Sequence, residues 1–88
     1  MKVSIIPGGR IIVRILVSYN ERPPEQKVIV GVTWPSGKAT QLTEEFLKMD
    51  WSPTYLAVLK LNGPLEAGTY KTEVKCGEES ELLEFTIV

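Results

Sequence analysis

The sequence predicts an all-β protein folded as an antiparallel sandwich of about seven strands. Three observations support this prediction. Apolar and polar residues alternate with a period of two over most of the chain, clusters of Gly, Pro and Asn separate the alternating segments, and no segment shows the period of a long helix. Because a half-apolar sheet buries its apolar side against another layer, two packed sheets are expected. The 88 residues are expected to form one domain, residues 1–88.

The first half of the chain contains three candidate strands. Residues 3–5 alternate before the Pro7-Gly8-Gly9 turn, and residues 10–19 form the longest alternating run. The opposite sides of that run differ, because Ile12 and Leu16 are surplus apolar residues on an otherwise polar side. The side expected to face the core consists of Ile11, Val13, Ile15, Val17 and Tyr19. In residues 27–34 the expected core side consists of Val28, Val30, Val32 and Trp34.

The second half is less regular. A turn at Pro35-Ser36-Gly37-Lys38 leads to a short strand at 39–42. Residues 43–53 fit either a helical turn capped by Thr43 or irregular edge structure, of which the edge is favoured. Residues 54–61 are apolar on both sides, so the periodicity does not decide which side is inside. A hairpin at 77–80 leads to a final strand, in which the inward positions are Leu83, Phe85 and Ile87.

Residues 65–77 contain a tight corner followed by a strand. Gly68 tolerates the positive φ of a sharp approach, and Tyr70 begins a regular alternation two residues later. The Glu66-x-Gly68-x-Tyr70 spacing resembles the tyrosine corner of immunoglobulin-like sandwiches, in which the phenol binds backbone upstream. An ordinary glycine turn before a strand is the alternative.

The chain resembles the small immunoglobulin-like modules, of fibronectin III or E-set type, of prokaryotic surface and secreted proteins. The resemblance is carried by the corner, by the Trp34-Pro35-Ser36-Gly37 turn and by the closing Phe85-Thr86-Ile87-Val88 strand. It implies an immunoglobulin-like antiparallel β-sandwich that acts as a spacer, an adhesion unit or a binding domain. The chain departs from disulfide-bearing relatives, because the positions that would carry the bridge are Val13 or Ile15 and Thr72.

Composition argues against several functions. Ten basic and eleven acidic residues give a net charge of −1, which disfavours binding to nucleic acid or to anionic membrane. The chain has no histidine and no apolar run long enough to insert into a bilayer. Its one cysteine, Cys76, is expected on the same side of its strand as Tyr70 and Val74, which is where a buried hydrophobic residue lies. We therefore expect no enzyme activity, no catalytic residue, no metal and no cofactor.

Aromatic residues suggest a ligand-binding alternative. Trp51 and Tyr55, together with Tyr19, are candidates for a surface platform of the kind that sugar-binding modules use. Trp51 otherwise covers the open side of the sandwich. Trp34 has the parity of Val30 and is expected in the core. A carbohydrate-binding module that uses Trp51 and Tyr55 is thus the second functional hypothesis.

Outward-facing apolar residues predict an interaction surface, which consists of Ile12, Leu16, Leu82 and Val88. The final strand has few charges and no proline, so it offers unpaired backbone groups at an edge. We expect one edge or face to meet another protein chain or a neighbouring domain, or to form a weak homo-oligomer. The alternative is a solvated monomer whose final strand closes the sheet beside the first strand.

The favoured function is a non-enzymatic structural or protein-interaction module, one domain of a larger surface or secreted protein. Met1 and Lys2 lead directly into a strand, so no signal peptide is expected. The location is then extracellular or at the cell surface if the chain is cut from a longer protein, and cytoplasmic if it is complete. Scarce Asn and Gln beside abundant Ile, Val and Leu suggest a thermophilic source.

Overall fold

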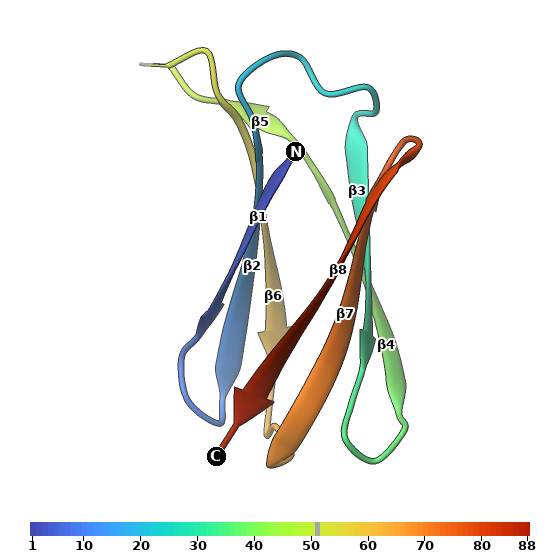
Figure 1. Ribbon diagram of the computed structural model, residues 1–88. Helices are drawn as coiled ribbons and strands as arrows, with labels where there is room; N and C mark the ends of the chain where they lie inside the picture. Colours follow the sequence, from blue (N-terminus) through green and yellow to red (C-terminus); the bar gives the residue numbers. More distant parts are fainter. Residues whose placement is uncertain (51) are drawn as a thin grey trace.

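The computed structural model describes residues 1–50 and 52–88, which form two four-stranded antiparallel sheets packed face to face (Figure 1). One sheet has the strand order β1-β2-β6-β5 and the other β4-β3-β7-β8. The predicted all-β antiparallel sandwich is confirmed, and no described residue is helical. The strands are β1 (Lys2–Pro7), β2 (Ile12–Tyr19), β3 (Lys27–Thr33), β4 (Ala39–Glu45), β5 (Leu47–Lys48), β6 (Tyr55–Asn62), β7 (Gly68–Cys76) and β8 (Glu79–Ile87).

The core lies between the sheets and is built from the inward side of each strand. Every fully buried Val or Leu side chain contributes roughly 1.5–3 kcal/mol relative to its exposed state. Aromatic rings fill one part of this core, since Tyr70 stacks on Phe85 at 4.8 Å and contacts Trp34 at 5.3 Å between ring centroids. The buried aliphatic residues include Val13, Ile15, Val17, Val28, Val30, Val32, Ala57, Leu59, Leu61 and Val74.

The core prediction is wrong at Ile11, whose side chain is 74% exposed. The β1–β2 turn extends further than the alternation suggested, because the amide of Gly8 donates to the carbonyl of Ile12 at 2.8 Å. Ile11 therefore lies in the turn, and β2 begins one residue later. Tyr19, at the other end of β2, is only half-buried.

The uncertain middle segment is edge structure, as favoured from the sequence. β4 continues as far as Glu45, and Leu47 and Lys48 then form the short edge strand β5 beside β6. The pairing also decides the orientation of β6, whose inward residues are Ala57, Leu59 and Leu61.

The first and last strands are edges of different sheets. β1 pairs only with β2, and β8 pairs only with β7, so the final strand does not close a sheet beside the first. The two edges are still neighbours, because the terminal ammonium group of Met1 lies 3.8 Å from a carboxylate oxygen of Glu79. Figure 1 shows the N-terminus and the C-terminus toward opposite ends of the molecule.

Candidate interaction surfaces

The corner at the start of β7 has the geometry that its spacing suggested. The Tyr70 hydroxyl donates to the backbone carbonyl of Glu66 at 2.8 Å, and burial raises the pKa of this phenol. Gly68 has φ +128°, and a Cβ there would lie 2.8 Å from the Pro35 side chain. The Glu66 carboxylate accepts from the backbone amide and the hydroxyl of Ser36, at 3.1 and 2.9 Å. These residues thus tie two loops together and have a structural role.

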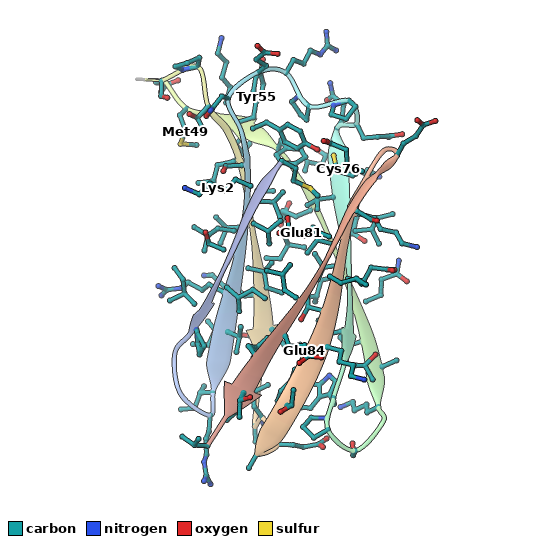
Figure 2. The ribbon with its side chains drawn as sticks, viewed as in Figure 1. Lys2, Met49, Tyr55, Cys76, Glu81 and Glu84 are labelled. Carbon is teal, nitrogen blue, oxygen red and sulfur yellow. The ribbon has the colours of Figure 1, made fainter. Side chains whose placement is uncertain are left out.

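The predicted aromatic platform stays a prediction, because the structure describes two of its three residues. Trp51 lies outside the described residues, so the structure does not test its role. Tyr55 is half-buried at the upper end of the sandwich in Figure 2, opposite Tyr19 and Lys48 on the neighbouring strands. The Tyr19 and Phe46 rings form a T-shaped pair with centroids 5.5 Å apart.

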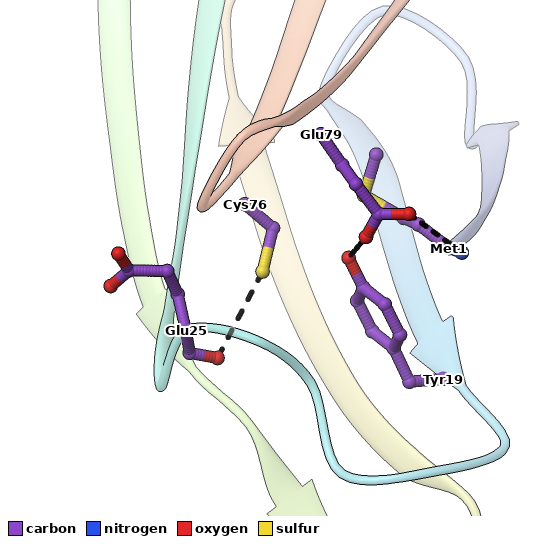
Figure 3. Close-up of polar contacts among 5 residues, drawn as sticks. All are labelled: Met1, Tyr19, Glu25, Cys76 and Glu79. Atoms are coloured by element: carbon purple, nitrogen blue, oxygen red, sulfur yellow. Dashed lines mark hydrogen bonds and ion pairs between the residues drawn. The ribbon is translucent and has the colours of Figure 1, made fainter.

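A polar cluster at the same end joins the two sheets (Figure 3). The Tyr19 hydroxyl donates to the Glu79 carboxylate, and the buried Cys76 thiol points at the carbonyl of Glu25, 3.9 Å away. Burial raises the pKa of Tyr19, and the hydrogen bond to Glu79 raises it further. Sequence reasoning does not find this cluster, because it places residue 79 in the hairpin at 77–80 rather than on a strand. The contacts of the cluster link β2 to β8.

The predicted interaction residues do not form one surface, which corrects the expectation of a single edge or face. Ile12 and Leu16 point outward from the β1-β2-β6-β5 sheet and are half-buried. Leu82 is 76% exposed on the outer side of the other sheet. Val88 follows β8, and its carbonyl accepts from Arg10 Nε at 2.9 Å. The alternation along each strand predicts which residues point outward, but the outer sides of the two sheets face in opposite directions.

The outer side of the β1-β2-β6-β5 sheet is apolar and basic. Leu16 lies opposite Val58, and Leu47 lies opposite Leu56, so leucine and valine side chains continue across three strands. We call this surface the basic-apolar face; it comprises Lys2, Ile6, Arg14, Leu16, Leu47, Leu56, Val58 and Lys60. Of these residues the predicted interaction surface contained Leu16 alone, and the undecided sides of β6 left Leu56, Val58 and Lys60 unplaced.

The charges on the basic-apolar face have one sign. Arg14 lies directly opposite Lys60, which places like charges on adjacent strands. No acidic residue is found among the described residues that point outward from β1, β2, β6 and β5. Neither Arg14 nor Lys60 forms an ion pair with any residue that the structure describes. The nearly balanced charge of the whole chain therefore conceals a face that is positively charged.

The outer side of the β4-β3-β7-β8 sheet carries both signs of charge and a shallow groove of about 950 Å³. We call it the groove face. Gly31 forms the floor of the groove, with Gln41 on β4 and Glu73 on β7 directly opposite it. The Glu73 carboxylate lies 3.1 Å from the Lys75 ammonium group. The glycine in the middle of β3 is the sequence signal for this groove that the sequence analysis did not use.

The described residues contain no group of His, Cys, Asp and Glu side chains that would hold a metal ion. They also contain no helix with the length and apolar composition needed to cross a membrane.

Comparison with known proteins gives one structural likeness to report. No protein-family model and no curated protein matches this sequence. Among solved structures, the chain resembles a segment of chitinase ChiW from Paenibacillus sp. strain FPU-7, described as a cell-surface-expressed, multi-modular bacterial enzyme. The TM-score is 0.60 at 18% sequence identity, and the match covers 97% of this chain but 8% of that protein. At this identity the likeness shows the fold alone: this chain has the fold of one module of a much longer protein.

Proposed function

We propose that this chain is a non-enzymatic immunoglobulin-like module with a structural or protein-interaction role in a larger surface or secreted protein. The strand order carries the proposal. Immunoglobulin sandwiches place strands A, B, E and D in one sheet and C, F and G in the other, with an added C′ strand in some classes. The orders β1-β2-β6-β5 and β4-β3-β7-β8 correspond to these sets, and Tyr70 lies at the start of the strand equivalent to F.

The basic-apolar face is the surface that we assign to a neighbouring module. Two opposed cations without a counter-charge are unfavourable in the isolated chain, and a carboxylate-bearing neighbour relieves this repulsion. Val58 on β6 and Leu47, which is 69% exposed on the edge strand β5, supply apolar area on the face. The segment of chitinase ChiW supports the idea of a neighbour, since that protein is multi-modular.

The test compares the 88-residue chain with a longer polypeptide that includes the modules encoded beside it in its gene. Hydroxyl-radical footprinting should label Leu16 and Val58 less in the longer polypeptide, because a neighbour covers them. Charge reversal with the R14E/K60E pair should restore labelling, whereas the matched change K71E on the groove face should not. Equal labelling in both polypeptides would overturn the assignment.

Enzyme and carbohydrate functions are separated by a second assay. Glycoside hydrolysis uses a pair of carboxylates on either side of the scissile bond. Under this proposal no such pair operates here, and the isolated chain should release no reducing sugar from chitin. Calorimetric titration with chitin oligosaccharides should likewise show no binding. Binding that is lost in W51A or Y55A would replace the interaction proposal by the carbohydrate hypothesis.

A further inference from the structure

Gly31 has no structural role within this chain. It lies in the middle of β3 with regular pairing on both sides, and it is not among the glycines with positive φ. A Cβ built there would meet no heavy atom within 4 Å. Glycine weakens a strand interior, and in such positions it often marks the close approach of another molecule. The missing side chain leaves room for a molecule that docks on the outside of the sheet.

The groove face carries a projecting side chain next to this hollow. Ile29 is two residues before Gly31 on β3, points to the same side and is 41% exposed. The strand register places Lys75 beside Ile29 and Glu73 beside Gly31 on β7. Residues that lie side by side across the strands form a row. The row of Gly31 and Glu73 therefore has a hollow and an acidic residue, and the next row, of Ile29 and Lys75, has a projecting apolar side chain and a basic residue.

We propose that the groove face binds a second copy of this chain through a two-fold symmetric interface. The symmetry axis lies in the plane of the interface, runs across the strands and passes between these two rows. Such an axis exchanges the rows. Ile29 of each copy then enters the hollow over Gly31 of the other, and Glu73 of each copy faces Lys75 of the other. On β8 the same operation sets the exposed Leu82 against Ser80, and on β4 it sets Gln41 against Thr43, so no like charges meet in these rows.

A second copy is the occupant that this surface fits best. The symmetry makes the contact self-complementary and closed, as two-fold interfaces are. The sandwich measures 37 × 26 × 15 Å along its principal axes, so a broad face has about the 800 Å² per partner of a stable interface. The basic-apolar face offers no such charge pairing to a second copy, because none of the described residues that point outward from it is acidic. The proposed dimer does not depend on whether a neighbouring module docks on that opposite face.

Sedimentation velocity of the isolated chain over about 10 μM to 1 mM tests the proposal. The wild type should shift from monomer to dimer as concentration rises. E73K and K75E should each weaken the dimer by about tenfold or more, because like charges then face each other across the axis. The E73K/K75E double variant should recover the wild-type affinity, because opposite charges face each other again and the pair within each chain is also kept.

Two more variants control for folding and location. Gly31→Val fills the hollow and should abolish the dimer while circular dichroism stays unchanged, because its side chain has open space in the monomer. R14E, on the opposite face, should leave the dimer unchanged. A monomer at every concentration, or a folded double variant without recovery, would overturn the proposal. So would binding of a chitin oligosaccharide that G31V blocks, since the groove would then belong to a carbohydrate.

Discussion

The two outer faces of the sandwich are built on the same alternation of residues, yet they differ in almost every surface property. The basic-apolar face holds cations without counter-charges around a centre of Leu and Val. The groove face alternates acidic and basic residues around a hollow. In a chain whose net charge is −1, both faces thus carry cations, but the outward-pointing acidic residues that the structure describes lie on one sheet. The difference teaches that the average composition of a small β-protein says little about either face alone.

Alkaline pH should have the largest effect, and it acts on both sheets. Burial raises the pKa of Tyr19 on β2 and of Tyr70 on β7 above the ordinary value of 10.0. The unfolded chain therefore loses these protons at a pH where the folded chain keeps them, so stability present below about pH 10 is lost as the pH rises. Urea midpoints should be lower at about pH 11 than at about pH 9. Tyr19→Phe and Tyr70→Phe should each remove part of this loss, one per sheet.

The next largest effect should come from the corner that supports the groove face. Tyr70→Phe keeps the ring packing but leaves the Glu66 carbonyl without its hydrogen bond, at a cost of roughly 1–2 kcal/mol in the free energy of unfolding. Thr69→Ala, one residue earlier and on the outer side, loses only an exposed contact to Thr86 and should cost much less. Equal small losses in urea unfolding would mean that the corner bond contributes nothing.

A gain in stability is expected from the inner side of the same sheet. The Thr72 hydroxyl is buried and has no hydrogen-bond partner in the described part of the chain. Thr72→Val replaces it with a methyl group of similar size and should stabilise the fold by about 1 kcal/mol. Val32→Thr, at the paired position on β3, should destabilise by a similar amount and serves as the reverse control. A less stable T72V would show that the hydroxyl is satisfied in solution.

The smallest effects should distinguish the two faces by sign. Arg14→Glu turns a repulsive cross-strand pair with Lys60 into an attractive one and should stabilise the monomer by about 0.2–1 kcal/mol. Glu73→Lys removes an exposed ion pair with Lys75 and should destabilise it by about the same amount or less. Measurements at high salt should shrink both changes. The same sign for both variants in dilute solution would remove the electrostatic contrast between the faces.

Sequence reasoning predicted the strands, most of the core and the corner because these depend on local alternation and turn chemistry. Val13, Ile15 and Val17 are buried as their parity requires, and Tyr70 binds upstream backbone as its spacing from Glu66 suggested. Ile11 failed because a turn hydrogen bond moved the start of β2 past it. Local patterns do not fix the residue at which an alternation begins.

The interaction surfaces were harder to predict because a surface is a sum over paired strands. Leu16 was identified, but its neighbour Val58 lies 42 residues further along the chain and only the register brings the two together. Leu82 was grouped with Leu16 by exposure, although the two lie on opposite sides of the molecule. The hollow at Gly31 needed both flanking strands to be known, since a glycine alone does not show whether its surroundings are open.

The placement of β1 and β8 has a mechanical consequence. These outer strands belong to different sheets, and the free ends of the chain lie toward opposite ends of the molecule (Figure 1). A stretching force applied through those ends therefore runs nearly along the strands, across hydrogen bonds that antiparallel ladders set perpendicular to them. Within the ladder between β1 and β2, and within the ladder between β7 and β8, the hydrogen bonds are then loaded in shear and share the force, whereas a pull that peels a strand from one end would open its bonds one after another. A link of this kind in a tethered protein would extend little until a whole ladder yields.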